Sequence, residues 1–169
     1  MEISIERIQI FVFDFDGVLT NNDVYIDQDG KESVSCSRSD GLAFDVLRKI
    51  NKPTYILSTE ENKVVTARAN KLKVPVFQGV EDKAKAIKSL ADSKAFDLDS
   101  VLYVGNDLND YNAMKLCKYT SCPSDSHKII KSISTYVLKT PGGGGVVREL
   151  LEGVFKLNFI EILYSKGEH

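Results

Sequence analysis

Two aspartates separated by one residue, Asp14 and Asp16, are the first residues of this chain whose types and spacing could do chemistry. They end the stretch 8–14, which is rich in β-branched and aromatic side chains and typical of a strand buried in a parallel sheet. Open α/β sheets bind ligands at the carboxyl ends of such strands, and Gly17 permits the chain to turn there. Two carboxylates held this close would raise one pKa, so the pair favours a divalent cation. An ordinary Asp-rich turn is the alternative.

Polar side chains also follow three further predicted strands. In chain order they are Ser58 with Thr59, Lys83, and Asp107 with Asp110. Hydroxyl and backbone N–H groups at the start of a helix form a site for phosphate, and a lysine there would neutralise a phosphate oxygen. Each group taken alone is explained by a helix cap or a solvated surface. Four strand ends that present Asp/Asp, Ser, Lys and Asp/Asp in this order favour a phosphate and metal site.

Strand-like and helix-like stretches alternate along the chain. We expect strands at 8–14, 55–57, 74–77 and 101–104, and helices at 40–50, 60–72, 81–94, 108–117 and 146–156. Pro75 places the third strand near a sheet edge. Asp29-Gly30 predicts the turn of a small β-hairpin inserted at about 21–38. The alternation predicts an α/β fold, a Rossmann-like parallel sheet with helices on both faces.

Length and composition limit the remaining possibilities. The chain has 169 residues, which predicts a single domain over 1–169, with a glycine-rich joint at Pro141–Gly145 and a C-terminal tail at about 157–169. The net charge is −2 and no basic block occurs, so nucleic acid is not expected as a partner. No apolar run approaches the roughly 20 residues of a membrane span, and residues 1–7 lack a signal-peptide pattern.

The cysteines and histidines bear on compartment and metal type. The three cysteines form no C-x-x-C pair, which favours reduced thiols in a cytoplasmic protein. Two histidines, His127 and His169, are too few for a histidine-rich zinc site, so an oxygen-ligated metal is the better expectation.

Four motifs occur in one order along the chain. They are Asp14-Phe15-Asp16-Gly17-Val18-Leu19-Thr20, Ser58, Lys83 and Gly105-Asn106-Asp107-Leu108-Asn109-Asp110. With these motifs the chain resembles the haloacid dehalogenase superfamily of phosphohydrolases. It is similar in particular to the small branch without a cap domain that dephosphorylates 3-deoxy-2-keto sugar acid phosphates. The residues that carry this closer similarity are Asp40-Gly41, Gln78-Gly79-Val80-Glu81-Asp82-Lys83 and Gly142-Gly143-Gly144-Gly145-Val146-Val147-Arg148-Glu149.

The resemblance implies a Mg²⁺-dependent phosphatase that works through an aspartyl-phosphate. Asp14 is the expected nucleophile, and Asp16 is the expected general acid and base. The implied protein ligands of Mg²⁺ are the Asp14 carboxylate, the Asp16 backbone carbonyl and the Asp107 carboxylate.

The remaining motif residues have implied roles around the phosphate and the metal. Ser58, the Thr59 backbone and Lys83 are expected to hold the phosphoryl oxygens. Asp110 is expected to orient Lys83 or a water on the metal. Asn106 stands where an aspartate is common, a loss of one charge that bears on metal affinity.

Two departures from the family pattern concern the substrate. Phosphatases of the eight-carbon 3-deoxy-D-manno-octulosonate (KDO) 8-phosphate usually carry T-G-R and R-D-G where this chain has Ser58-Thr59-Glu60 and Ser39-Asp40-Gly41. Relatives that act on nine-carbon KDN- or sialic-acid-type 9-phosphates look similar to this chain at both places. The eight- and nine-carbon substrates therefore both remain open.

A charged stripe on the predicted helix 60–72 is a candidate substrate contact. At 100° per residue, Glu60, Arg68 and Lys71 fall within about 80° of one another, on an arc separate from the apolar one. We expect the stripe, with Ser39 and Asp40, to meet hydroxyls and a carboxylate of the substrate. A solvated face of charge pairs is the alternative.

The branch without a cap also implies a homotetramer, because relatives cover the open site with neighbouring subunits. The hairpin carries Tyr25 and Ile26, which a lone exposed hairpin could not bury. The stretch 157–164 is expected to pack on its own domain or over a neighbour's site. Two other functions stay open: a non-catalytic assembly domain, like the one attached to some CMP-sialic acid synthetases, and a phosphotransferase or mutase of the same fold.

Overall fold

Six parallel strands form the centre of the protein. The structure, a computed structural model, describes residues 3–165. The strand order is β5-β4-β1-β6-β7-β8, and every neighbouring pair is parallel. The strands are β1 Ile10–Phe13, β4 Thr54–Leu57, β5 Val76–Phe77, β6 Val101–Val104, β7 Tyr119–Cys122 and β8 Tyr136–Val137. The predicted α/β fold with a parallel sheet is confirmed, and β5 lies at a sheet edge, as Pro75 predicts.

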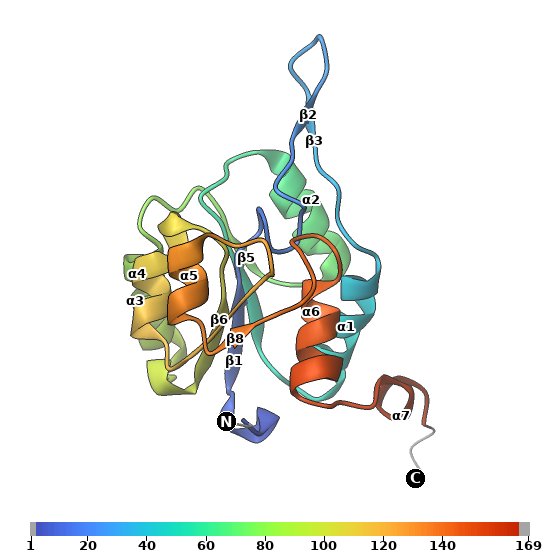
Figure 1. Cartoon of the computed structure of the whole chain (residues 1–169), viewed down its shortest axis with the longest axis vertical. Coiled ribbons are helices and arrows are strands. Elements are labelled where there is room, and N and C mark those ends of the chain that lie inside the picture. Colours follow the sequence, from blue (N-terminus) through green and yellow to red (C-terminus); the bar gives the residue numbers. More distant parts are fainter. Residues whose placement is uncertain (1–2, 166–169) are drawn as a thin grey trace.

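Helices cover both faces of the sheet (Figure 1). On one face lie α1 Ser39–Lys49, α2 Lys63–Leu72 and α6 Val146–Glu149, and on the other α3 Lys83–Lys94, α4 Tyr111–Leu116 and α5 Lys128–Ile133. Strand β1 supplies both cores because successive side chains point to opposite faces. Phe11 and Phe13 pack with α1, whereas Ile10 and Val12 pack with α3 and α4. Burial on both faces explains why the strand reads as a continuous apolar run.

The predicted helix at 60–72 begins three residues later than expected, at Lys63. Asn62 is its N-cap, and its side chain accepts a hydrogen bond from the Val64 N–H at 3.1 Å. Glu60 lies before the helix, where its Oε1 accepts hydrogen bonds from the N–H groups of Glu61 and Asn62, each at 2.8 Å. The prediction that Glu60 shares a helical stripe with Arg68 is therefore wrong. Glu60 belongs to the capping loop before α2, whose polar composition resembles that of a first helical turn.

The predicted hairpin is present between β1 and α1. Its strands are β2 Tyr25–Ile26 and β3 Glu32–Ser33, which pair antiparallel and project beyond the sheet (Figure 1). Tyr25 is 59% exposed and Ile26 is 68% exposed. Asn62 donates a hydrogen bond to Glu32 at 2.9 Å, which ties the base of the hairpin to the start of α2.

The last described segment packs on its own chain. After α6, a π-helical turn Leu150–Val154 leads to α7 Phe159–Tyr164. The Arg148 guanidinium lies 4.4 Å from the centre of the Phe159 ring, and Lys49 donates a hydrogen bond to the Leu163 carbonyl at 2.9 Å. Of the two arrangements expected for 157–164, packing on its own domain is the one observed. The end of the predicted tail, 166–169, lies outside the described residues.

Two further expectations can be compared with the described residues. Between 3 and 165, no helix is both long enough and apolar enough to cross a bilayer. All three cysteines are free thiols, and Cys117 and Cys122 are buried in the structure.

Candidate active site

The strand order places two of the predicted motifs side by side. From β1 the chain passes to β4 and β5 on one side and then to β6 on the other, so the connections change direction at β1. Ligands bind beyond the carboxyl ends of the strands at such a point. Asp14 follows β1 and Asp107 follows the adjacent β6, and the Asp14 N–H donates to the Val104 carbonyl at 2.9 Å.

A cavity of about 280 Å³ opens at this place. Eight residues line it: Asp14, Asp16, Asn22, Thr59, Asn106, Asp107, Leu108 and Asn109. The first and fourth motifs therefore meet in one cavity, as the sequence predicts. Five of these lining residues were predicted from the sequence as site residues: Asp14, Asp16, Thr59, Asn106 and Asp107.

Lys83 lies beneath the cavity and connects two carboxylates. Its Nζ is 2.7 Å from Oδ1 of Asp14 and 2.8 Å from Oδ1 of Asp110. All three side chains are almost fully buried, with at most 4% exposed. Lys83 opens α3, whose N-cap is Asp82, so the helix start holds the ammonium group under the end of β1. The expectation that Asp110 orients Lys83 fits this contact.

Asp110 is held by more donors than Lys83 alone. Its Oδ1 also accepts a hydrogen bond from the Tyr103 hydroxyl at 2.9 Å, and its Oδ2 accepts from the Asn106 N–H at 2.9 Å. Tyr103 is fully buried in β6. Sequence analysis treated it only as strand core, although a tyrosine in an otherwise apolar run requires a polar partner when buried. That requirement was the available signal.

A tight turn carries Asp16. Gly17 has φ +75°, and the N–H groups of Leu19 and Thr20 both donate to the Phe15 carbonyl. The Thr20 hydroxyl accepts a hydrogen bond from the Gly17 N–H at 3.1 Å and donates to Oδ1 of Asp16 at 3.5 Å. Thr20, the last residue of the first motif, is fully buried, and its contact with Asp16 gives it a role that the sequence alone did not assign.

Asn106 packs directly against this turn. A Cβ added to Gly17 would lie 1.8 Å from the side-chain nitrogen of Asn106, and this contact together with the positive φ favours glycine at that position. The Asn106 Oδ1 is buried and has no hydrogen-bond partner among residues 3–165. An unpaired buried acceptor at the cavity wall is available to a ligand or a cation.

The buried carboxylates make the site more negative than Lys83 can balance. Burial, followed by the charge of Asp110, raises the pKa of Asp14 well above its usual range, and the Lys83 ammonium only partly opposes this. Burial lowers the pKa of Lys83, but the charges of Asp14 and Asp110 outweigh it and raise the pKa overall. Burial, and then the charge of Glu60, also raises the pKa of Asp16. A divalent cation would compensate this excess negative charge and keep Asp14 ionised.

The donors at the cavity fit a hard divalent cation. Within residues 3–165, no three carboxylate, thiol or imidazole side chains converge closely enough to make a metal site alone. The expected set needs only two carboxylates, Asp14 and Asp107, because its third ligand is the backbone carbonyl of Asp16. A small number of oxygen ligands from the protein suits Mg²⁺, because this ion usually retains several of its water ligands.

The predicted phosphate contacts lie on the β4 side of the cavity. Thr59 lines the cavity, and its hydroxyl accepts a hydrogen bond from the Asn109 side chain at 3.5 Å. Ser58 is buried just below, where its Oγ accepts a hydrogen bond from the Glu60 N–H at 3.1 Å. The Ser58 hydroxyl proton is therefore available to another acceptor.

The predicted specificity residues do not line this cavity. Arg68 and Lys71 line a second cavity, of about 400 Å³, together with Cys36 and Arg38. Arg68 donates to the Ser37 carbonyl at 2.7 Å. The structure thus separates this pair from the Asp14 site within one chain.

Asp40 and Ser39 lie against the start of α6. Asp40 is 1% exposed, and its Oδ1 accepts a hydrogen bond from the Arg148 N–H at 3.1 Å. Asp40 does not line the Asp14 cavity, so its expected contact with the substrate has no support in its position. The Ser39 hydroxyl lies 2.6 Å from that of Ser37.

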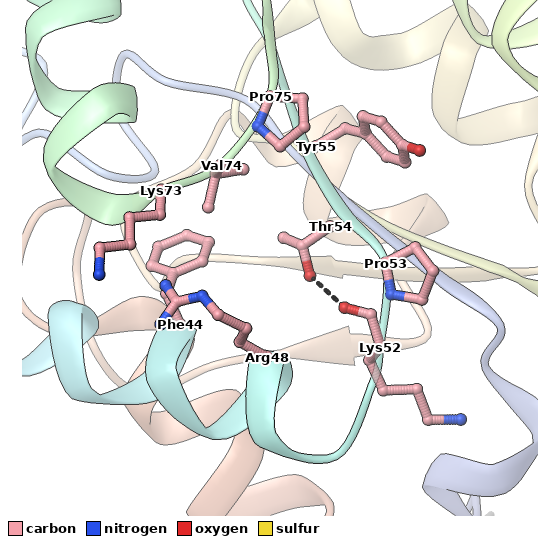
Figure 2. A pocket seen from close by; sticks show the side chains of 9 residues that line it. All are labelled: Phe44, Arg48, Lys52, Pro53, Thr54, Tyr55, Lys73, Val74 and Pro75. Atoms are coloured by element: carbon pink, nitrogen blue, oxygen red, sulfur yellow. Dashed lines mark hydrogen bonds between the residues drawn. The ribbon is translucent and has the colours of Figure 1, made fainter.

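Another cavity lies at the opposite end of β4 and lacks the same chemistry. Figure 2 shows its nine lining residues, which include Arg48, Lys52 and Lys73 but no carboxylate. The Lys52 ammonium points away from the cavity and donates to the Ile8 carbonyl at 2.7 Å. This cavity offers no carboxylate that could attack phosphorus or bind a cation, whereas the Asp14 cavity offers several, so the Asp14 cavity is the candidate active site.

Known proteins share this arrangement. The sequence model of the family described as haloacid dehalogenase-like hydrolase matches residues 48–150. This chain belongs to the haloacid dehalogenase-like hydrolases. The crystal structure of a haloacid dehalogenase family hydrolase from Streptomyces avermitilis has a TM-score of 0.91 to this structure and is 38% identical in sequence. The match covers 94% of this chain and 91% of that chain.

Two relatives carry a more specific description. The 3-deoxy-D-manno-octulosonate 8-phosphate phosphatase of Salmonella typhi is 29% identical over 148 residues, 87% of this chain and 79% of that protein. The enzyme of that name from Moraxella catarrhalis, solved with magnesium, phosphate and KDO, is 26% identical, with a TM-score of 0.85. The match covers 90% of this chain and 88% of the Moraxella catarrhalis chain. The predicted family, its branch without a cap domain and the prediction of a phosphatase-type enzyme are confirmed.

Proposed function

We propose that this protein is a Mg²⁺-dependent phosphatase that hydrolyses the phosphate monoester of a 3-deoxy-2-keto sugar acid. The observation that carries the proposal is the buried Lys83 bridge between Asp14 and Asp110, directly under a cavity shared by Asp14 and Asp107. A structural domain would gain little from two buried carboxylates around one lysine, because burying charge is costly. The magnesium named for the Moraxella catarrhalis relative supports the choice of metal.

Asp14 is the nucleophile in this proposal. Two of its side-chain contacts, with Lys83 and with the Phe15 N–H at 2.7 Å, are made by Oδ1. These contacts fix the carboxylate through Oδ1, so its other oxygen is oriented and can attack phosphorus to form an aspartyl-phosphate. Mg²⁺, held by Asp14, Asp107 and the Asp16 carbonyl, would lower the repulsion between the anionic nucleophile and the phosphate.

Asp16 is the general acid and base. Its raised pKa keeps a proton available for the departing sugar oxygen, and the ionised form then takes a proton from the water that cleaves the aspartyl-phosphate. Ser58, the Thr59 backbone and Lys83 would hold the phosphoryl oxygens as their charge changes. The buried Ser58 hydroxyl and the Lys83 ammonium are both fixed before the substrate binds, which favours such stabilisation.

The relatives and the sequence point to different chain lengths for the substrate. The curated relative acts on the eight-carbon 8-phosphate by its name. Glu60 and Ser39, however, stand where arginines are usual in that group, and Glu60 is close enough to Asp16 to influence its pKa. We therefore keep a nine-carbon KDN or sialic-acid-type 9-phosphate as the second substrate.

We further propose one catalytic domain over 1–169 that assembles as a homotetramer in the cytoplasm. The exposed Tyr25 and Ile26 on a two-strand hairpin support an assembly contact, since such a hairpin cannot bury them alone. Assembly would also give Arg68 and Lys71 a route to the substrate, because in one chain they lie outside the Asp14 cavity.

Phosphate release from the 8-phosphate and the 9-phosphate tests the proposal. We expect release from at least one of them with Mg²⁺ and none with EDTA. Asp14→Asn should abolish turnover, whereas Asp45→Asn, a change of an exposed carboxylate on α1, should not. Release from neither substrate by an intact tetramer would contradict the enzyme and favour the assembly domain.

A further inference from the structure

The glycine-rich segment Pro141–Gly145 lies against the turn that carries Asp16, although more than 120 residues separate the two in sequence. A flexible joint was the expectation for this segment, and the contacts correct it. The Gly143 N–H donates to the Val18 carbonyl at 3.0 Å, and the Gly142 N–H donates to Oδ1 of Asp125 at 3.0 Å. The segment is thus bonded on two sides.

Two glycines allow an approach that no other residue permits. A Cβ on Gly142 would lie 2.3 Å from the Gly17 carbonyl oxygen and 2.9 Å from that of Thr20. Gly143 has φ +68°, and its Cβ would lie 2.5 Å from the Asn21 nitrogen. These neighbours are backbone atoms, which cannot rotate away as a side chain could. The glycines are therefore required by contact with the turn.

The far end of the segment is anchored to α1. Gly145 has φ +109° and leads into α6, whose Arg148 N–H donates to the buried Asp40. At the near end, the Glu149 carboxylate accepts hydrogen bonds from the N–H groups of Lys139 and Thr140, at 2.9 and 2.7 Å. Both ends of the segment are fixed by buried or half-buried carboxylates, so it forms a rigid support.

We propose that this support is a positioning element for Asp16, with Gly142 and Gly143 as positioning residues. The connection runs through the turn: Gly142 packs on the carbonyls of Gly17 and Thr20, and the Thr20 hydroxyl bonds to the Asp16 carboxylate. Displacing the turn would move the proton donor away from the leaving oxygen. Asp14 would stay in place, because the β-sheet and Lys83 hold it.

This inference rests on the proposed role of Asp16. Substrates with different leaving groups distinguish a misplaced Asp16 from a general loss of structure. A sugar alkoxide needs a proton as it departs, whereas p-nitrophenolate leaves readily without one. Loss of the aligned acid should therefore slow the release of the sugar in the first turnover much more than the release of p-nitrophenol, when both are measured before the shared cleavage of the aspartyl-phosphate. A variant that is only partly folded would lose both activities by the same factor.

Three variants make the test. Asp16→Asn should show the selective loss, by a factor of about 10²–10⁴ on the sugar phosphate. Gly142→Ala should show the same selectivity with a smaller factor, at least about tenfold. Lys94→Ala is the control, because Lys94 is an exposed residue at the end of α3, away from the site, and it should leave both rates unchanged.

Asp125 provides a variant that does not risk the fold, since its side chain is exposed. Asp125→Ala removes the acceptor of the Gly142 N–H and should lower the sugar-phosphate rate selectively, while Asp125→Asn keeps an acceptor and should restore it. Equal losses on both substrates in Gly142→Ala and Asp125→Ala, beside a selective loss in Asp16→Asn, would overturn the positioning role alone. Equal losses in Asp16→Asn itself would overturn the proposed acid role.

Discussion

Replacing Lys83 with methionine tests the buried network on which the site depends. The substitution keeps the length of the side chain but removes its charge, which leaves Asp14 and Asp110 facing each other without a cation. Removing one partner of a buried ion pair destabilises a protein by about 3–5 kcal/mol, because a charge remains buried and unpaired. Loss of one preorganised donor to the transition state costs about 10²–10³ in kcat.

The loss of stability should depend on pH. Without Lys83, the pKa of Asp14 rises further, so the folded variant binds a proton that the unfolded chain releases at the same pH. A carboxyl with a raised folded pKa contributes stability at low pH and loses it as pH rises through that pKa. The deficit relative to the original protein should therefore be larger at pH 8 than at pH 5.

Urea denaturation in EDTA at both pH values, together with phosphate release in Mg²⁺, measures both effects. Lys85→Met is the matched control, because Lys85 is exposed two residues later on α3, and its stability should stay within roughly 0.5 kcal/mol of the original. A deficit of the same size at pH 5 and pH 8, or a Lys83→Met protein with unchanged turnover, would refute this reasoning.

Three further substitutions probe neighbouring contacts. Tyr103→Phe removes one donor from Asp110 and should lower the free energy of unfolding by about 1–2 kcal/mol in urea titrations; unchanged stability would contradict the bond. Gly105→Ala places a Cβ 2.6 Å from the Asp110 side chain and should reduce phosphate release at least about tenfold, so full activity would contradict that packing. Burial raises the pKa of Asp40 to about 6, so its contribution to stability should fall by about 2 kcal/mol as pH rises from 4 to 6. Urea titrations of Asp40→Asn should lack this part of the pH dependence, and an identical pH profile would contradict it.

Local patterns were sufficient to predict the sheet and the central pair of motifs. Strand β1 is apolar at every position because it is buried on both faces, which is a signal that a single sequence carries. The motif residues follow strand ends, and parallel strands present those ends at one edge, so Asp14 and Asp107 could be expected to meet. This inference needs only the α/β class and no knowledge of which strands are neighbours.

The errors arose where contacts are long-range. Nothing near Pro141–Gly145 in the sequence shows that the segment packs on the turn after β1, so its glycines were interpreted as flexibility. Similarly, Asp40 lies in the first turn of α1, where an acidic residue is usually exposed, yet it bonds to a helix that starts more than 100 residues later. Glu60 was misplaced for a local reason, since a capping loop and a first helical turn share the same polar composition.

Chemical trapping of residue 14 during turnover tests most directly whether Asp14 is the nucleophile. Protein quenched in acid while it hydrolyses its sugar phosphate can be treated with borohydride, which reduces an aspartyl-phosphate to homoserine but leaves a free carboxylate unchanged. We expect peptide mass spectrometry to find homoserine at position 14 in the presence of Mg²⁺ and to find none in Lys83→Met. Active turnover with only unmodified aspartate at position 14 would contradict the proposed mechanism.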